Sequence, residues 1–334
     1  MTAPVVVGTG RLTLDVLVRD GEPRELARAQ SGGTCGNVLT NLAYLGWAAY
    51  PLADVGDDDP GRRYRRDLDC WGVRLDLVQS YPEQATPVII HHLRGGHEFS
   101  SRCPFCGHTL QYYEPVPLER VEARLPRVPR ADVYFFDRDS PGSLRLARHC
   151  RERGALVVYE PNYAGPDSQL DEALAVADVL KFSHDKLGGL AETRSLAGPR
   201  LVIETLGGEG LRFLDTRVGR WEHQPAFRVP VVRDAGGSGD WCTAGFLHRH
   251  WQGDDFGEAL RFGQALAAWN CAFEGARGGL YRVGRKTMMR HVLQLATGEV
   301  FDPMEGAGPS TLDEAGAFCP VCRGDRVAEW PGGG

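Results

Sequence analysis

Runs of apolar residues alternate along the chain with segments of helical periodicity, and this alternation predicts the class of fold. Short runs rich in β-branched and aromatic residues predict buried strands at residues 5–7, 48–55, 88–93, 132–136, 155–159, 179–182 and 201–205. Helical patterns cover residues 35–44, 60–71, 142–153 and 169–177, and two further helices start at Asp240 and Glu258. Strands that alternate with helices in this way favour a mostly parallel sheet with helices on both faces.

The composition of the chain indicates which kinds of molecule the protein binds. The 334 residues are 42% hydrophobic, which is enough for a substantial core. The formal net charge of −6 argues against a dedicated nucleic-acid binder, because such proteins carry a basic face. No apolar stretch approaches the ~18 residues of a membrane span, and the N-terminus lacks the basic and apolar regions of a signal peptide. We therefore expect a cytoplasmic protein that binds small molecules and does not enter a membrane.

The most informative polar stretch is Asp-Ala-Gly-Gly-Ser-Gly-Asp at residues 234–240, directly ahead of an apolar helix. Its glycines, Gly236, Gly237 and Gly239, allow positive φ angles and bring backbone N–H groups close to an anion. The N-terminus of the following helix attracts negative charge. Asp240 would then lie beside a bound phosphate, where it could take a proton from an attacking hydroxyl. Alternatively, Asp240 is only the N-cap of the helix.

Other candidate residues follow predicted strands, where sheets of this kind bind their ligands. They are Asp15, Gly32 and Gly33 with Asn37, residues 160–162 and residues 205–210. Each also has a plainer explanation. Asp15 could be a surface acid and Asn37 a helix cap, and the glycine segments could be ordinary turns.

These motifs, in this order, resemble those of the ribokinase-like (PfkB) carbohydrate kinase family over approximately residues 5–285. Residues 31–37 (Ser-Gly-Gly-Thr-Cys-Gly-Asn) are similar to its N-terminal Gly-Gly…Asn signature, with Asp15 as the preceding acid. Residues 205–210 (Thr-Leu-Gly-Gly-Glu-Gly) match its nucleotide loop, and residues 234–245 resemble its C-terminal signature. The resemblance implies an α/β fold with a three-layer α/β/α core, a mostly parallel sheet and a small β lid.

The resemblance also implies a reaction, the transfer of the γ-phosphoryl group of ATP to a hydroxyl of a sugar or nucleoside with the help of Mg²⁺. Asp240 is then the general base, and the anion hole is formed by Gly237, Ser238 and Gly239. The substrate would be held by Asp15, Gly32, Gly33, Asn37 and Asn162. The nucleotide would be contacted by Thr205, Gly207, Gly210, Lys186 and Asp234. Fixed donors and a positioned hydroxyl suit the loose, charge-spread transition state of phosphoryl transfer.

Departures from the family pattern leave a second function open. Residues 183–186 are Ser-His-Asp-Lys where many members carry Asn-x-x-Glu or Ser-x-x-Glu, so Lys186 reverses the charge of an acid that helps to arrange Mg²⁺ and phosphate. Asp185 could replace that acid, Lys186 could contact phosphate directly, or Lys186 could simply be solvated. Residues 235–236 (Ala-Gly) replace a Thr-Thr pair, and Ser238 replaces the usual Ala. The rival hypothesis is a catalytically weak or inactive protein of the same fold that binds a sugar or nucleotide and regulates a partner.

Two Cys-x-x-Cys pairs predict a metal site apart from the kinase motifs. The pairs are Cys103 with Cys106 and Cys319 with Cys322. Each pair supplies half of a tetrahedral zinc site, and the joined Cys₄ set leaves no open position for a catalytic water. We therefore expect one structural Zn²⁺ per chain. The alternatives are a pair of redox motifs or unrelated surface cysteines.

The cysteine pairs also indicate how the chain is divided. Residues 1–300 form the expected core, with lid segments at about 12–30 and 85–118. Residues 301–334 form a Gly-, Pro- and acid-rich linker that leads to the second knuckle. Because the first knuckle lies in the lid, we expect the tail to return and clip it, within one subunit or across a homodimer formed through the lid. In the rival hypothesis this zinc ribbon contacts a partner.

Overall fold

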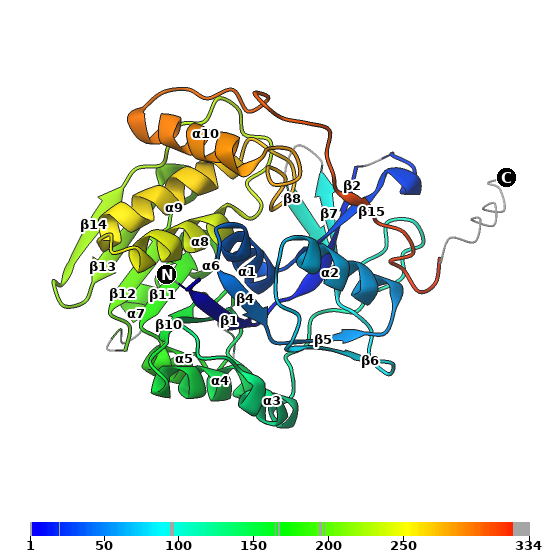
Figure 1. Cartoon of the computed structure of the whole chain (residues 1–334), viewed down its shortest axis with the longest axis horizontal. Coiled ribbons are helices and arrows are strands. Elements are labelled where there is room, and N and C mark those ends of the chain that lie inside the picture. Colours follow the sequence, from blue (N-terminus) through cyan, green and yellow to red (C-terminus); the bar gives the residue numbers. More distant parts are fainter. Residues whose placement is uncertain are drawn as a thin grey trace.

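An eight-stranded sheet forms the centre of the molecule in the computed structural model (Figure 1). The structure describes residues 2–322, apart from residues 20, 94–96, 164, 166–167, 194–195 and 197. The strands of this sheet are β1 (Val5–Thr9), β4 (Ala48–Pro51), β9 (Val133–Phe136), β10 (Leu156–Tyr159), β11 (Val179–Ser183), β12 (Leu201–Thr205), β13 (Leu211–Asp215) and β14 (Arg220–Gln224). Their order is β14-β13-β12-β11-β10-β9-β1-β4. Strands β12 to β4 run parallel, and β13 and β14 pair antiparallel at one edge.

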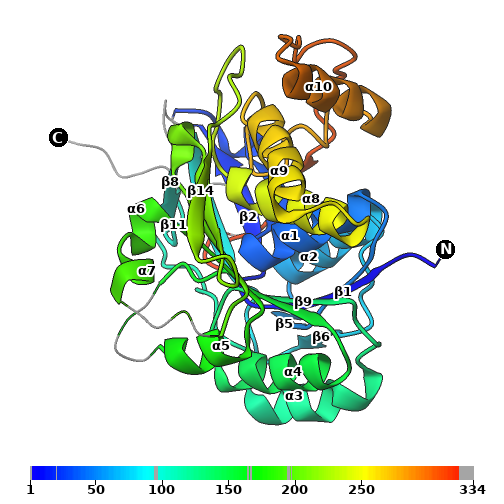
Figure 2. The ribbon, with the colours of Figure 1, turned by 90° about the vertical axis from the view of Figure 1, so that its left-hand side faces the viewer.

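Helices cover both faces of this sheet (Figure 2). One face carries α1 (Thr34–Tyr44), α8 (Ser238–Trp251) and α9 (Phe256–Asn270), and α10 (Arg285–Thr297) packs against α9. The other face carries α3 (Leu118–Arg124), α4 (Pro141–Glu152) and α5 (Leu170–Val176). Each face buries its own apolar core, which includes Trp241 and Trp269 on the first face and Tyr134 and Phe136 on the second. The predicted three-layer α/β/α fold with a mostly parallel sheet is confirmed.

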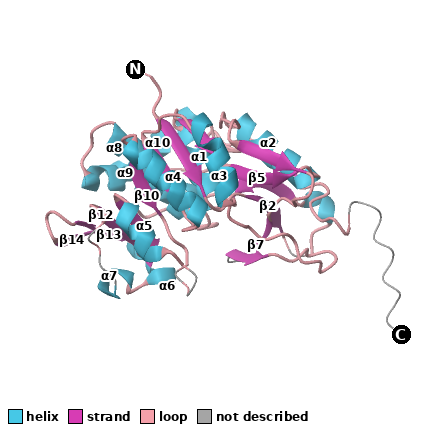
Figure 3. Cartoon of the chain, turned by 90° about the horizontal axis from the view of Figure 1, so that it is seen from below, coloured by secondary structure: helices cyan, strands magenta, loops and turns pink. Residues whose placement is uncertain are grey.

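A second sheet of five strands stands beside the main sheet, and four of these strands lie on the segments expected to form the lid (Figure 1). Its strands are β2 (Thr13–Val18), β3 (Arg28–Gly32), β7 (Val88–Leu93), β8 (His97–Ser100) and β15 (Asp313–Glu314), in the order β15-β3-β2-β7-β8. The first segment runs on to Gly32 instead of ending near residue 30, because β3 pairs with β2 as far as Gly32. Figure 3 shows β2 and β7 at the end of the molecule away from the hairpin β13–β14.

The remaining elements are short or lie between the two sheets. They are β5 (Ala53–Gly56), β6 (Val78–Tyr81), α2 (Asp59–Cys70), α6 (His184–Leu187), α7 (Leu190–Thr193) and the 3₁₀ helices η1 (Arg24–Leu26), η2 (Leu125–Arg127) and η3 (Gly207–Glu209). Within the described ranges, no helix combines the length and the apolar character that a membrane crossing requires.

Residues 48–55 form strands in two different sheets, so the single strand predicted there is wrong. β4 ends at Pro51 in the main sheet, and β5 pairs with β6 in a two-stranded sheet. The chain leaves the main sheet at Leu52, whose N–H donates to the Gly8 carbonyl at 2.8 Å. Apolar patterning is continuous across this point and cannot show a change of partner. The pattern also predicts neither α10 nor the hairpin β13–β14.

The tail packs against the rest of the chain as far as residue 322. Phe301 is buried beside His291 of α10, with ring centroids 5.0 Å apart. β15 pairs with β3, and Arg63 of α2 donates to the Glu314 carbonyl at 2.6 Å. The expected linker is therefore a packed part of the structure over this range. Residues 323–334, the end of the expected tail, lie outside the described residues.

Candidate active site

Helix α8 begins at the glycine turn that the sequence singles out. Gly237 is its N-cap and has a φ of 72°, a left-handed conformation that other residues rarely adopt. A Cβ atom at this position would lie 2.4 Å from the Ala276 carbonyl oxygen. Asp234 fixes the turn, because its carboxylate accepts the N–H groups of Gly236 at 2.7 Å and Gly275 at 2.8 Å. Asp234 thus holds the turn, and its contact with nucleotide stays a prediction.

Asp240 lies in the first turn of α8, and its carboxylate faces another predicted residue. The Asn37 amide donates to Asp240 Oδ2 at 2.7 Å. Burial and the nearby charge of Glu160 raise the pKa of Asp240 to about 8. Because Gly237 is the N-cap and Asp240 binds Asn37 instead, the explanation of Asp240 as a cap alone is wrong. Asn37 lies inside α1, so it is not a helix cap either.

A buried ion pair lies close to the glycine turn. Glu160, directly after β10, pairs with Lys181 of β11, and Thr243 Oγ1 donates to the second Glu160 oxygen at 2.7 Å. A Cβ atom on Gly239 would lie 3.5 Å from Lys181 Nζ, so the pair packs against the turn. Burial lowers the pKa of Lys181, but Glu160, Cys242 and Asp240 together outweigh burial and leave that pKa raised. The sequence analysis missed Lys181, although a lysine within the apolar run 179–182 is a usable signal.

Asp15 and the glycines beside it form the other side of the site. Thr13 Oγ1 donates to Asp15 Oδ1 at 2.6 Å, and His91 Nε2 lies 3.1 Å from Asp15 Oδ2. Burial alone would raise the pKa of Asp15, but His91 and Thr13 bring it below its usual value. A Cβ atom on Gly32 would lie 1.9 Å from Asp15 Oδ2, so only glycine fits there. Gly33 is the N-cap of α1, the helix that carries Asn37. Asp15 is therefore a buried acid and not a surface acid.

Arg277 links this side of the site to the glycine turn. It is fully buried, and its guanidinium donates to the Ser31 carbonyl and, at 3.1 Å, to Asp67 of α2. The segment that carries Arg277 also supplies the Gly275 N–H that binds Asp234. One short segment therefore holds both the predicted substrate loop and the predicted anion-binding turn. No local pattern in the sequence indicates this role for Arg277.

Asn162 and Lys186 lie together at the edge of the site. Lys186 Nζ donates to Asn162 Oδ1 at 2.7 Å, and Asn162 Nδ2 donates to Thr34 Oγ1 at 3.2 Å. Loss of hydration lowers the pKa of Lys186, and the negative charges of Asp240 and Glu160 oppose this effect. Lys186 is an exposed residue whose ammonium group is held by Asn162, and its contact with phosphate stays a prediction.

The predicted nucleotide loop forms a tight turn after β12. Thr205 ends the strand, and Gly207 and Gly210 have φ angles of 57° and 104°. A Cβ atom on Gly210 would lie 2.1 Å from the Gln224 carbonyl oxygen. The loop adjoins a cavity of about 380 Å³ that is lined by His184, Asp185, Leu206, Glu209 and Arg212. This cavity lies beyond the carboxyl ends of β11 and β12, where parallel sheets bind their ligands.

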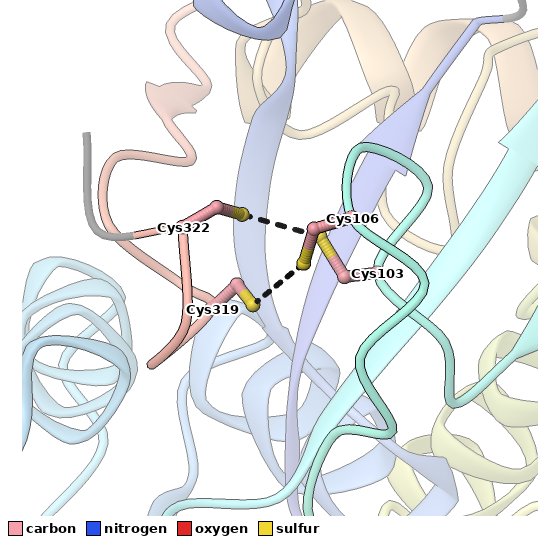
Figure 4. A group of neighbouring side chains, drawn as sticks. All are labelled: Cys103, Cys106, Cys319 and Cys322. Carbon is pink, nitrogen blue, oxygen red and sulfur yellow. Dashed lines mark hydrogen bonds between the residues drawn. The ribbon is translucent and has the colours of Figure 1, made fainter. Parts of the chain in front are cut away.

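The four paired cysteines come together at a second site (Figure 4). Cys103 Sγ lies 3.6 Å from Cys322 Sγ, and Cys106 Sγ lies 3.6 Å from Cys319 Sγ. All four sulfur atoms lie within 4.8 Å of one another. A disulfide would need ~2 Å, whereas a tetrahedron with Zn–S bonds of ~2.3 Å has edges of ~3.8 Å. The four thiols therefore are not unrelated surface cysteines, and they meet within one subunit.

Comparisons with known proteins identify the class of this chain. A model of the pfkB family carbohydrate kinases matches residues 24–281. A protein named ATP-dependent ribose-1-phosphate kinase from Halopiger xanaduensis is 32% identical over 286 residues, which cover 81% of this chain and 93% of that protein. A nucleoside kinase from Methanothermobacter thermautotrophicus is 24% identical over 76% of this chain and 82% of its own length. The chain therefore belongs to the pfkB family of carbohydrate kinases, and the predicted phosphotransferase with an alcohol acceptor is confirmed.

Solved structures agree on the fold. Ribokinase from Arabidopsis thaliana, complexed with ribose and ATP, has a TM-score of 0.66 and 21% identity, and the match covers 87% of this chain and 99% of that one. A nucleoside kinase from Burkholderia thailandensis, in complex with inosine, has a TM-score of 0.68 and 18% identity, with 87% and 98% covered. At these identities the likeness establishes the ribokinase fold alone.

Proposed function

We propose that this protein transfers the γ-phosphoryl group of ATP to a hydroxyl of a sugar or nucleoside, with Asp240 as the general base. The observation that carries this proposal is the place of Asp240, which is buried in the first turn of α8, directly after the glycine turn, and bonded to Asn37. A base whose pKa of about 8 lies near the working pH can both accept and release a proton. The N-terminus of α8 would stabilise the charge of the transferred group.

In the proposed reaction, Asp240 accepts the proton of the acceptor hydroxyl. The oxygen of that hydroxyl attacks the γ-phosphorus of ATP, and the bond between the γ-phosphorus and ADP breaks. The acceptor hydroxyls are held by Asp15, Asn37, Asn162 and the Gly32-Gly33 segment. The γ-phosphate is received by the backbone amides of residues 237–239. The Glu160–Lys181 pair packs against Gly239 and so helps to fix this turn. A turn that is fixed before the substrates bind loses no free energy to reorganisation during the reaction.

We further infer that ATP occupies the cavity beside residues 205–210, with Lys186 directed to its phosphates. The exposed carboxylate of Asp185 lines the same cavity and is an oxygen ligand of the kind that Mg²⁺ prefers. Mg²⁺, held mainly by the ATP phosphates, would neutralise part of their charge. In this proposal Asp185 takes the role of the family Glu, one residue before Lys186, which occupies the position of that Glu.

The test is an ADP-release assay with ATP and Mg²⁺ across pentoses, hexoses, their phosphates and nucleosides. Asp240→Asn should lower kcat by about 10²- to 10⁴-fold for every acceptor that the wild type uses, while ATP binding changes little. Asp69→Asn, a change to an exposed acid on α2, is the matched control and should behave as wild type. Phosphoryl transfer by Asp240→Asn at the wild-type rate would contradict the proposed base.

A second candidate function is a ligand-binding regulatory protein that has lost turnover. Lys186 favours it, because a positive charge stands where many family members carry the acid that arranges Mg²⁺. The same assay separates the two functions when it is paired with calorimetric binding of ATP and acceptors. Binding without any phosphorylated product would support the regulatory protein and overturn the kinase.

We also propose that the four cysteines hold one structural Zn²⁺ and that the second sheet is the lid of the site. The sulfur separations of 3.6 Å suit a tetrahedral thiolate site. Elemental analysis of freshly purified, unchelated protein should find one zinc per chain. The double variant Cys319→Ser/Cys322→Ser should contain none, whereas Cys70→Ser, at an exposed cysteine outside the cluster, should keep it. Wild-type protein without zinc would contradict this assignment.

We place the protein in the cytoplasm and expect a homodimer through the lid. None of the nine cysteines, which all lie within the described residues, forms a disulfide, and this fits a reducing compartment. The outer strand of the second sheet, β8, exposes Phe99, whose side chain is 59% exposed. β15 occupies the opposite edge and leaves β8 as the edge available to a partner. Sedimentation analysis of the wild type beside Phe99→Ser tests the interface, and a wild-type monomer at high concentration would refute it.

A further inference from the structure

Three cationic side chains lie around the Asp240 side of the site. Lys186 is bonded to Asn162, and the charges of Arg11 and Arg138 both lower its pKa. The two arginines therefore lie within electrostatic reach of Lys186. Lys186 has a proposed partner in ATP, but the arginines have no place in the proposed reaction.

Arg11 lies between β1 and β2, next to the predicted substrate loop. Its backbone N–H donates to Asp137 Oδ1 at 2.7 Å, and its backbone carbonyl accepts the Gly36 N–H at 3.4 Å. A Cβ atom on Gly33 would lie 2.3 Å from the Arg11 carbonyl oxygen and 3.2 Å from Arg11 Cγ. The stem of the Arg11 side chain thus runs across Gly33. Its guanidinium lies over Tyr112, 5.5 Å from the ring centroid.

The charge of Arg11 is not neutralised by a direct partner. Among the residues that the structure describes, no carboxylate lies within ion-pair distance of its guanidinium, and its Nε is buried without a hydrogen-bond acceptor. Arg11 nevertheless lies close to Asp15 and Asp137, because its charge lowers the pKa that each would otherwise have. Buried donors in native proteins are nearly always bonded, so an orphaned one in a binding site points to a ligand.

Arg138 adds a second guanidinium on the same side. It follows β9, and it donates to the Asp137 carbonyl at 2.6 Å and lies 3.5 Å from Asp137 Oδ2. The other oxygen of this carboxylate accepts the backbone N–H of Arg11, so the Arg11 guanidinium takes no part in that bond. The Asp137 carboxylate thus pairs with the Arg138 guanidinium, whereas the Arg11 guanidinium has no ion-pair partner among the described residues.

We infer that the acceptor carries an anionic group of the phosphate class, which Arg11 and Arg138 bind. This inference rests on the proposed function of the same site. Guanidinium groups match phosphate through paired N–H donors, which a neutral hydroxyl cannot use equally well. The place of Arg11 beside Gly33, in the predicted substrate loop, assigns it to the acceptor. A sugar phosphate therefore fits the site better than a free sugar or a nucleoside.

The test measures binding first, so that it does not depend on turnover. Calorimetry with ribose 1-phosphate, ribose 5-phosphate, ribose and inosine should show the tightest binding for one of the two phosphates. Arg11→Gln should weaken binding of that phosphate by about 10- to 100-fold and should change binding of ribose, inosine and ATP little. Arg11→Lys should recover part of the loss, because lysine keeps the positive charge but lacks the paired N–H donors of a guanidinium group. Arg130→Gln, at an exposed arginine before β9, is the matched control.

Several outcomes would overturn this inference. They are a wild type that binds ribose or inosine as tightly as both phosphates, an Arg11→Gln variant that weakens all acceptors equally, and a variant that weakens ATP instead. The ADP-release assay then separates the two proposals. If sugar phosphate binds through Arg11 but receives no phosphoryl group, the kinase proposal fails while the anionic ligand stands. If neutral acceptors are phosphorylated and phosphates are not bound, the kinase stands and this inference fails.

Discussion

The Asp240 site and the Cys₄ cluster both unite segments that lie far apart in the sequence, but different forces hold them together. At the Asp240 site, the protein supplies its own partners, among them Asn37 for Asp240 and Lys181 for Glu160. At the cluster, four thiols approach one another to 3.6 Å across two pairs. Four thiolates at such distances repel strongly unless a cation lies between them. The first site is thus formed by the fold, whereas the second would depend on the proposed Zn²⁺.

The contacts that the protein makes around the cluster involve the tail backbone and its aromatic rings. Arg24 donates to the Cys322 carbonyl, and its guanidinium lies 5.4 Å from the ring centroid of Phe318. Phe318 lies 6.2 Å from Phe105 between ring centroids. These contacts dock the tail against the first knuckle. We therefore expect loss of the metal to loosen the lid and tail while the Asp240 site keeps its shape.

Apart from Asp240→Asn, the largest effect on the Asp240 site should come from Gly237→Ala. The new Cβ would meet the Ala276 carbonyl oxygen at 2.4 Å, in a left-handed conformation that disfavours alanine. The start of α8 must then shift, and kcat should fall by about 10²- to 10³-fold, as when anion-binding donors are displaced. Gly253→Ala is the matched control, because Gly253 follows the same helix with a φ of 103° and open space around it. Equal losses of kcat in both variants would show that strain alone, and not the turn, controls the rate.

Arg277→Met should have the next largest effect. It removes a fully buried guanidinium from Asp67 and Ser31, and a broken buried pair costs about 3–5 kcal/mol of unfolding free energy. The substrate loop should loosen, so that the KM for the acceptor rises by about 10- to 100-fold and the KM for ATP changes little. Urea unfolding and steady-state kinetics measure the two effects.

Two variants control for simple loss of folding. Arg277→Lys keeps the positive charge but lacks the paired N–H donors of the guanidinium group. Its losses of unfolding free energy and of acceptor affinity should be smaller than those of Arg277→Met. Arg282→Met changes an exposed arginine of the same segment and should leave both unchanged. If Arg277→Lys folds stably and retains the wild-type KM for the acceptor, Arg277 does not position the substrate loop.

The contrast between the two sites also explains how far the sequence predicts them. Ordered glycine motifs and the Cys-x-x-Cys spacing each carry their chemistry within a few residues, so Asp240 and all four cysteines were predictable. Arg277 was not, because its partners Ser31 and Asp67 are distant in sequence and leave no spacing pattern, and Lys181 was missed although its place in an apolar run is a signal. The division of residues 48–55 between two sheets likewise depends on partners that the strand pattern does not record. The fold class followed from the alternation of strands and helices, which is repeated along the whole chain.

The pH dependence of kcat should reflect the raised pKa of Asp240. Its carboxylate must lose its proton to act as a base, so activity rises as the pH passes upward through about 8. Between about pH 7 and about pH 9 the ionised fraction, and with it kcat, should increase by about 10-fold. Asp69→Asn should keep this profile, and the residual activity of Asp240→Asn should lack it. A wild-type kcat that is flat over this range would contradict either the base or its raised pKa.

Removal of the metal should have the smallest effect on the chemical step and the most local effect on structure. A chelator that removes zinc should leave the repulsion among the four thiolates unopposed. The tail should then detach, and strands β3 and β15 should exchange their amide hydrogens faster. The KM for the acceptor should rise by about 2- to 10-fold, and kcat should stay within about 2-fold, because no contact of Asp240 passes through the cluster. Cys70→Ser treated in the same way controls for the chelator, and added zinc should restore the original KM. If chelation instead lowers kcat as far as Gly237→Ala does, the Asp240 site is not preformed, and the two sites form one cooperative unit that the metal holds together.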